Sequence, residues 1–341
     1  MHGRRRRRHA ALWLTGVAAV LVTVGAAVTV GMIRLQRDEP EAPAAAAPAE
    51  RAPARKADQI TVDLDPTSGY VAAVRGTDAT RQFVTARDFT PGAGSGRYAG
   101  EVTAFDPGTF DPSALRRGEA ITVGGHDATF VPDYTFGRLT DGGEPHRTPL
   151  VGWQDPSGVW LMVYRGAGQR VEREELQRLA GAVTLAPPRE LRTPFRLGAV
   201  PAGLAASYVR SVEEERDGRS GTVGLSEPGR TGSQAAVYDA APPGIAILVS
   251  ASARDAKWTA EKARLTGRTE AGGHDAWYDT GHTQLSQGSA GSTLVVETDR
   301  CVIRLTTADR AKITRAALVA VVADMAIGDC ADLDTWIAPL S

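Results

Sequence analysis

A five-residue motif, Gly-Gly-His-Asp-Ala, occurs twice in this chain and contains the side chains best suited to chemistry. The two copies place His126 before Asp127 and His274 before Asp275. A carboxylate that orients an imidazole recurs in acid–base catalysis and in metal sites, so these four residues are candidates for an active site. On that interpretation the protein would be a hydrolase or a metal-dependent enzyme.

The same motif also has a structural interpretation, as a tight turn between two strands. Two successive glycines supply the positive φ angles of a hairpin turn, and aspartate caps such loops. Neighbouring residues on a strand point to opposite faces, so a histidine and the aspartate after it would not bind one ion together. A second histidine follows each motif, His146 and His282, but a metal site needs three or four converging ligands. The turn is the preferred interpretation.

Other signatures of catalysis are absent from the sequence. It contains no Gly-x-Ser-x-Gly elbow, no His-Glu-x-x-His motif and no phosphate-binding loop. We therefore predict no catalytic, cofactor-binding or metal-ligating residue, and no cofactor. The acidic run Glu213, Glu214 and Glu215 is interpreted as a solvated edge or turn.

The chain contains two cysteines, Cys301 and Cys330. In an oxidising compartment such a pair forms a disulfide, and the two lack the Cys-x-x-Cys spacing of a redox pair. The first lies in an apolar segment, and the second follows the last expected helix. We predict a structural disulfide that attaches the C-terminal tail, including Trp336, to the sheet.

The motif belongs to a longer internal repeat, which must supply the elements that position these residues. Its two copies are 148 positions apart, and Arg116 matches Arg264 at the same separation. A second set matches at a separation of 142, with Val171, Arg173, Leu176 and Leu179 corresponding to Ile313, Arg315, Leu318 and Val321. The difference of six predicts a longer loop in the first copy, at residues 140–147.

Each copy shows short strands followed by one closing helix. In the first copy, strands are expected at 59–64, 70–74, 101–105, 120–123, 128–131 and 159–164, with a helix at 172–183 that ends before Pro187 and Pro188. In the second copy, strands are expected at 206–212, 235–238, 245–250, 276–278, 294–297 and 301–305, with a helix from Thr314 to about 326 and an extra helix at 255–265. The pattern predicts an α+β fold of two related domains, 58–188 and 189–341, each with an antiparallel sheet and a closing helix.

The N-terminal region has the composition of a membrane anchor. Residues 1–9 form a basic stub, and residues 10–33 form an uncharged apolar run longer than the ~20 residues that a transmembrane helix needs. The arginines at 4–8 predict a cytoplasmic N-terminus, a single-pass anchor in the cell membrane and an extracytoplasmic location for the rest. An uncleaved signal anchor is preferred over cleavage near Ala27. Residues 34–57, rich in proline and alanine, are expected to form an extended linker.

The segment PFRLGAVPAGL at residues 194–204, the repeated turn and the helix after the apolar strand resemble a group of uncharacterised actinobacterial proteins. Those proteins have a single membrane anchor and tandem extracytoplasmic domains. The resemblance covers most of the chain after the linker. It implies an envelope-associated role, in sensing or in support of a regulatory system, and it identifies no catalytic residues.

The charge balance argues against nucleic acid as a partner. The whole chain has a formal charge of −1 and its first 57 residues contribute +6, which leaves −7 for the remainder. Binding to a phosphate backbone requires clustered lysines and arginines instead. The expected partners are the cell membrane, through residues 10–33, and an envelope protein or a lipophilic ligand. We expect a membrane-anchored binding, sensing or accessory protein that is not an enzyme.

Overall fold

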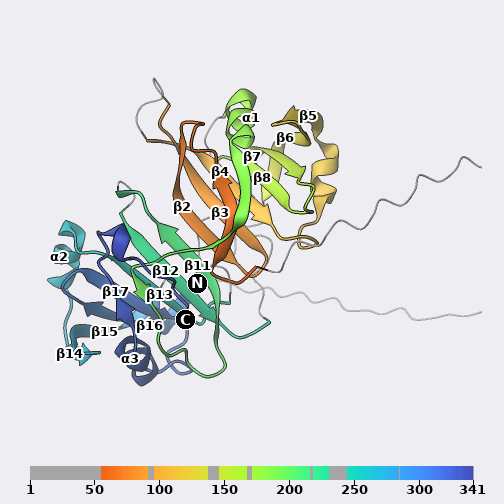
Figure 1. Cartoon of the computed structure of the whole chain (residues 1–341). Helices are drawn as coiled ribbons and strands as arrows, with labels where there is room; N and C mark the ends of the chain where they lie inside the picture. Colours follow the sequence, from red (N-terminus) through yellow and green to blue (C-terminus); the bar gives the residue numbers. More distant parts are fainter. Residues whose placement is uncertain are drawn as a thin grey trace, which may run out of the picture. The chain divides into compact units, whose positions relative to one another are not determined.

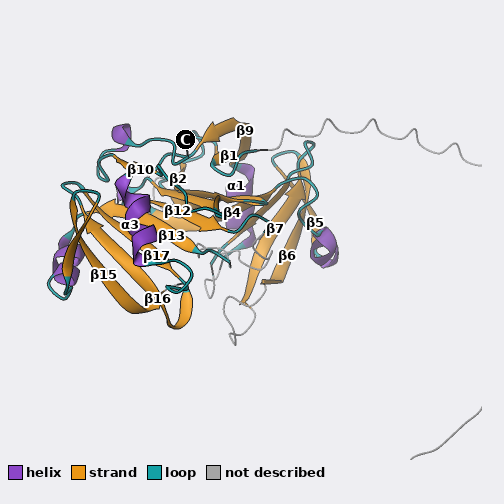
Figure 2. Cartoon of the chain, turned by 90° about the horizontal axis from the view of Figure 1, so that it is seen from below, coloured by secondary structure: helices purple, strands orange, loops and turns teal. Residues whose placement is uncertain are grey.

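Antiparallel strands form most of the fold, as the computed structural model of the chain shows for residues 55–90, 96–136, 146–166, 171–215, 218–229, 244–283 and 285–340 (Figure 2). In these ranges the largest sheet has 14 strands. The first copy of the repeat contributes β2 (Tyr70–Asp78), β3 (Arg81–Asp88), β4 (Arg97–Phe105), β5 (Glu119–Val123), β6 (His126–Phe136), β7 (His146–Gln154) and β8 (Trp160–Tyr164). The second contributes β11 (Ala205–Val212), β12 (Ser220–Ser226), β13 (Ile247–Ala253), β14 (Arg268–Ala271), β15 (His274–Thr283), β16 (Ser286–Glu297) and β17 (Cys301–Thr307).

The two copies have the same strand order. The first runs β2-β3-β4-β8-β7-β6-β5 across the sheet, and the second runs β11-β12-β13-β17-β16-β15-β14. Strands β2 and β11 pair antiparallel and join the copies at the middle (Figure 1). Residues 48–341 belong to one compact unit. The repeat found in the sequence is therefore a repeat of topology, and its copies are the two halves of one sheet.

One hydrophobic core contains side chains from both copies and from the elements that cover one face of the sheet. These elements are the helices α1 (Arg173–Gly181) and α3 (Arg315–Ala323) and two small antiparallel pairs, β1 (Gln59–Leu64) with β9 (Val183–Glu190) and β10 (Phe195–Arg196) with β18 (Ala326–Ile327). Leu176 and Leu179 of α1 and Leu318 and Val321 of α3 are buried in this core. The helical spacing of apolar residues in the sequence therefore marks the side of each helix that faces the core.

The side chains that alternate to the other face form three smaller clusters. Leu115 of the short 3-10 helix η1 (Pro112–Arg117) belongs to one of them, in the first copy. Trp258 of helix α2 (Ala256–Lys262) belongs to another, in the second copy. Because η1 precedes β5 and α2 precedes β14, these two short helices occupy equivalent places in the repeat.

The predicted α+β fold class is wrong, because the part of the chain that the structure describes is 51% strand and 14% helix. Most predicted elements are present, but seven strands were not predicted: β3, β7, β9, β10, β12, β14 and β18. Strand β9 also passes through Pro187 and Pro188, which were expected to end the first copy. The β1–β9 register shifts there, from Ile60 opposite Arg189 to Val62 opposite Leu185. The prolines lie in this bulge, where their missing N–H groups break no ladder hydrogen bond.

The structure does not support the predicted single-pass membrane anchor or the cell-membrane location based on it. No helix in the described part of the chain is long and apolar enough to cross a bilayer. The range predicted to be transmembrane, 10–33, lies outside the described residues, as do the basic stub, most of the linker and the strand expected at 235–238. The longer loop expected at 140–147 also falls mostly outside them, and His146 begins β7. Arg55, within the expected linker, is held by Asp106, with an Nε to Oδ1 distance of 3.2 Å.

Candidate functional site

Both His–Asp motifs lie at tight hairpin turns. The φ angles are 57° at Gly124, 83° at Gly125, 59° at Gly272 and 79° at Gly273. Each glycine pair is a two-residue loop, because Val123 pairs with His126 and Ala271 pairs with His274. Positive φ at both loop residues is the requirement of a type I′ turn, which glycine meets without a steric penalty. The turn interpretation is confirmed.

The histidine and aspartate of each motif are successive strand residues, so their side chains point to opposite faces of the sheet. Asp127 is exposed, and Asp275 accepts a hydrogen bond of 2.9 Å from Nε of Arg268. His146 and His282 lie on β7 and β15. The described residues contain no group of three or more His, Cys, Asp or Glu side chains placed to hold a metal ion. Each motif is thus a tight turn followed by two strand residues whose side chains lie on opposite faces.

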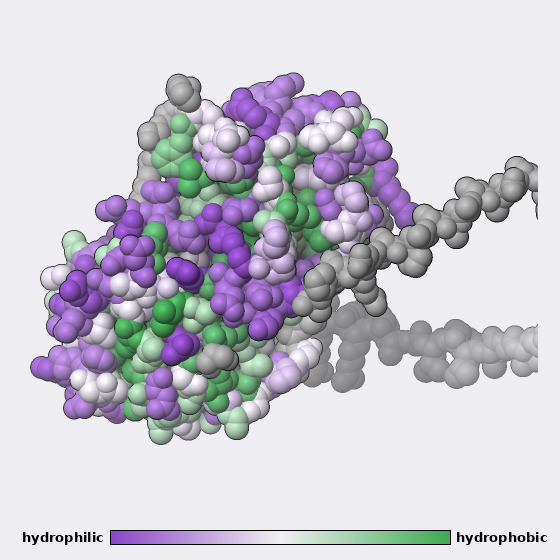
Figure 3. Space-filling view, viewed as in Figure 1, coloured by the Kyte–Doolittle hydropathy of each residue, from purple (hydrophilic) through white to green (hydrophobic). Residues whose placement is uncertain are grey.

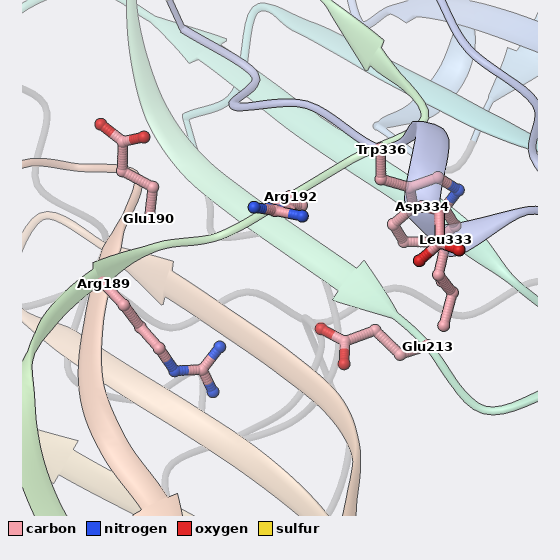
Figure 4. Close-up of a pocket in the computed structure, with 7 residues that line it drawn as sticks. All are labelled: Arg189, Glu190, Arg192, Glu213, Leu333, Asp334 and Trp336. Carbon is pink, nitrogen blue, oxygen red and sulfur yellow. The ribbon is translucent and has the colours of Figure 1, made fainter.

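A charged pocket of about 540 Å³ lies where β9, the end of β11 and the C-terminal segment meet (Figure 4). Its walls combine charged side chains with one aliphatic and one aromatic residue. They are Arg189, Glu190, Arg192, Glu213, Leu333, Asp334 and Trp336. A pocket of this size accommodates a small organic molecule.

Alternation along an extended segment places Arg192 in the pocket wall. Leu191 and Thr193 are buried on either side of it, so Arg192 points the other way and is exposed. The Leu191 N–H donates to the carbonyl of Asp58 at 2.8 Å, and Thr193 exchanges backbone hydrogen bonds with Ile337 at 2.9 and 3.0 Å. The backbone that carries Arg192 is thus fixed on both sides.

A chain of ion pairs connects two walls of the pocket. Arg189 Nη2 lies 2.7 Å from Asp63 Oδ2, Arg75 Nη2 lies 3.2 Å from Asp63 Oδ1, and Arg75 Nη1 lies 2.7 Å from Glu213 Oε2. Burial raises the pKa of Asp63, but the charges of Arg75 and Arg189 and the Leu64 amide lower it further, so the net shift is downward. Arg189 and Glu213 therefore each have a partner of opposite charge within the chain. Glu213 is not the freely solvated residue that the sequence indicated.

The disulfide positions the third wall. The structure joins Cys301 at the start of β17 to Cys330, with Cα atoms 5.5 Å apart. Beyond Cys330 the chain closes on itself, because the Trp336 indole N–H donates to the carbonyl of Asp329 at 3.0 Å. The Thr335 hydroxyl donates to the carbonyl of Asp332 at 2.8 Å in the same loop. This covalent and hydrogen-bonded frame holds Leu333, Asp334 and Trp336 against the pocket.

Three charged side chains of the pocket have no ion-pair partner among the described residues. Within the described residues, the side chains of Glu190, Arg192 and Asp334 make no hydrogen bond or ion pair. Figure 4 shows the Glu190 carboxylate directed away from the other labelled side chains, with Arg192 between Glu190 and Asp334. The pocket thus presents one cation and one anion that both remain available to a ligand.

Sequence reasoning did not identify this pocket. Its local signal was the alternation of a buried leucine, an arginine and a buried threonine at 191–193. Comparison of the chain with models of protein families and with curated protein sequences finds no match. The fold and the pocket describe a duplicated antiparallel-sheet protein with a charged pocket between β9, β11 and the C-terminal segment.

Proposed function

We propose that this chain is a binding protein without catalytic activity, and that its pocket takes a small zwitterion such as a free amino acid. The observation that carries the proposal is the pair Arg192 and Asp334, which line one pocket without neutralising each other. Arg192 would bind a ligand carboxylate in two-pronged fashion, and Asp334 would accept from a ligand ammonium group. Leu333 and Trp336 would contact the apolar part between them.

The surroundings of the pair support a polar ligand over a lipophilic one. Apolar ligands favour pockets lined mostly by apolar side chains, whereas five of the seven lining residues here are charged. Among the described residues, the large hydrophobic side chains exposed to solvent are Val71, Phe89 and Val200. On the face drawn in Figure 3, hydrophobic patches are interspersed with hydrophilic ones. A charged pocket on such a surface is suited to a soluble metabolite.

Calorimetric titration of the purified chain with the standard amino acids tests the proposal. The tightest ligand is then compared with its two singly charged analogues, which for leucine are 4-methylpentanoate and isoamylamine. Each analogue is expected to bind at least about tenfold more weakly, because one charged hydrogen-bonding group is lost. Arg192→Ala should weaken the amino acid but not the amine, and Asp334→Asn should weaken the amino acid but not the carboxylate.

Arg196→Ala is the matched control. Arg196 is an exposed arginine four residues after Arg192, and it is not part of the pocket wall. This variant should bind like the unaltered chain. The proposal is wrong if no amino acid binds saturably, or if the Arg192 and Asp334 variants bind as tightly as the Arg196 variant.

A further inference from the structure

A second hollow lies on the opposite face of the first copy, beside η1. Its volume is about 600 Å³, and its wall is formed by η1, β6 and the start of β7. The lining residues are Ser113, Ala114, Arg117, Val131, Asp133, Tyr134, Thr135 and Arg147. Val131 and the neighbouring Leu115 and Leu150 are buried in one hydrophobic cluster, so the floor of the hollow is packed. This hollow is separate from the pocket described above, since the two share no residue.

Two arginines in this wall have no partner among the described residues. Arg117 and Arg147 are exposed, and neither makes a hydrogen bond or ion pair there. One carboxylate, that of Asp133, lines the same hollow without pairing with either arginine. Guanidinium groups that line a concave site and are not neutralised attract oxyanions, which they bind through two parallel N–H donors. The net charge of the wall is positive.

Hydroxyl groups accompany these cations. Ser113, Tyr134 and Thr135 all lie in the wall. The Ser113 hydroxyl donates to Asp111 at 2.9 Å, so its oxygen can still act as an acceptor. Burial is the main cause of a raised pKa for Tyr134, which keeps its phenol protonated. A ligand with hydroxyl groups beside its anionic group therefore meets hydroxyl side chains as well as the two arginines.

In the second copy, the charged side chains near the equivalent short helix are paired with one another. There α2 replaces η1, and Trp258 packs against Trp277 with ring centroids 5.8 Å apart. Lys262 and Arg254 both pair with Glu297. A further arginine of this face, Arg304, lies 2.6 Å from Glu261, measured from Nη2 to Oε2. The two copies share their topology but differ in these charges. In the second copy each of these cations is paired with a carboxylate. Among the described residues of the first copy, no carboxylate is bonded to Arg117 or Arg147.

We propose that the hollow beside η1 is a binding site for an oxyanion carried on a small hydroxylated molecule, such as a sugar phosphate or a sugar acid. Arg117 and Arg147 hold the phosphate or carboxylate, and the hydroxyl side chains bind the body of the ligand. A volume of about 600 Å³ is in the range of pockets that bind drug-sized molecules, so a bare phosphate ion would occupy only part of the site.

Titration of the full-length chain with inorganic phosphate, glucose 6-phosphate, glucuronate and glucose tests the proposal, with ionic strength held constant by chloride. Glucose 6-phosphate and glucuronate are expected to bind saturably, with inorganic phosphate weaker and glucose at least about tenfold weaker than its phosphate ester. Arg117→Gln and Arg147→Gln should each reduce affinity for the anionic ligands by about tenfold.

Arg116→Gln is the control, because Arg116 is an exposed arginine of the same short helix and does not line the hollow. It should leave binding unchanged, and thermal unfolding of all three variants should match that of the unaltered chain. Any one of three results overturns the proposal. The first is that no anionic probe binds saturably, and the second is that binding persists when Arg117 and Arg147 are both replaced. The third is an equal loss of affinity in the Arg116 variant, which would indicate attraction by the overall positive charge of this surface. Loss of the amino-acid site through Arg192→Ala should not affect this one.

Discussion

Glu297, on strand β16, is the residue with the most consequential electrostatic environment in the second copy. It is 9% exposed and accepts hydrogen bonds from the indole N–H of Trp258 at 2.8 Å and from Lys262, while Arg254 lies 3.0 Å from Oε1. Burial raises the pKa of Glu297, but the hydrogen bonds from Lys262 and Trp258 and the nearby positive charges lower it further. The net shift is downward from the usual value of 4.5.

We predict that Glu297→Gln lowers stability at neutral pH and has no effect in acid. A carboxylate whose pKa falls on folding stabilises the native state above its unfolded pKa, and the stabilisation is lost as the pH falls through the folded pKa. The loss at pH 7 should be about 1 kcal/mol, since Lys262 and Arg254 remain partly solvated and the amide oxygen still accepts from Trp258. Urea unfolding measured between about pH 3 and pH 7 checks this.

The exposed Glu270 provides the control for this measurement. Glu270→Gln removes the same charge from the same half of the protein and should change stability little at any pH. A difference between Glu297→Gln and the unaltered chain that persists undiminished below pH 4 or so would contradict the electrostatic explanation.

At the same scale, residues with local signals could be predicted from the sequence. The paired glycines appear as positive-φ turns, and Thr314 caps α3 by accepting from the amide of Ala317 at 3.3 Å. The pocket residues could not be predicted in this way, because Arg192 and Asp334 are far apart in the chain and only the closed fold brings them together. Their charges carry no periodicity that distinguishes them from solvated surface residues.

At the level of elements, the sequence predicted strands rich in apolar residues and missed those with many polar ones. Strand β12, SGTVGLS, contains two glycines and three hydroxyl residues, yet it is buried along most of its length between β11 and β13. Gly221 is required there, because a Cβ atom would lie 2.6 Å from Thr193 Cβ and 2.6 Å from Pro194 Cδ. Neighbouring strands therefore determine its conformation more than intrinsic propensity does.

The C-terminal segment depends on the disulfide for its position. We predict that replacing both Cys301 and Cys330 by alanine lowers the free energy of unfolding by about 3.5 kcal/mol, the chain-entropy value for closing a loop across a sequence separation of 29. The same change should weaken the amino-acid ligand, because Asp334 and Trp336 lose part of their support. Denaturant unfolding and calorimetric titration measure the two effects.

Reduction of the unaltered chain by a thiol provides the comparison for this prediction. It should reproduce both effects, because it opens the same bond without changing the sequence. Equal stability of the oxidised chain and the double alanine variant would show that the segment is held by its hydrogen bonds alone.

On the scale of the whole molecule, the two copies meet through equivalent strands, β2 and β11. Residues Val74–Asp78 pair antiparallel with Tyr208–Val212, and Gly76 lies opposite Arg210 at the centre of the pairing. The first strand of one copy thus adds to the first strand of the other, which gives the sheet an approximate two-fold axis. The hydrophobic core also spans the junction, because α1 and α3 contribute to the same hydrophobic cluster.

This arrangement predicts that the halves hold together without the covalent connection between them. The turn at Ala202 and Gly203 is exposed, and Gly203 has a φ of 82°. The pieces on either side of it are joined by the β2–β11 and β10–β18 pairings, by the Thr193–Ile337 bridge and by the Arg75–Glu213 ion pair. A protease site inserted at this turn should therefore be cleavable without separating the pieces.

Gel filtration before and after cleavage measures the outcome. The cut protein should elute at the volume of the intact one and should dissociate only where denaturant also unfolds it, since the same core serves both halves. Replacing Arg210 by proline places proline in the strand interior at the centre of the junction, where it is poorly tolerated, and should make the cut pieces separate. Pieces that separate without this substitution would show that each copy is a domain of its own, and that the continuous sheet depends on the connecting chain.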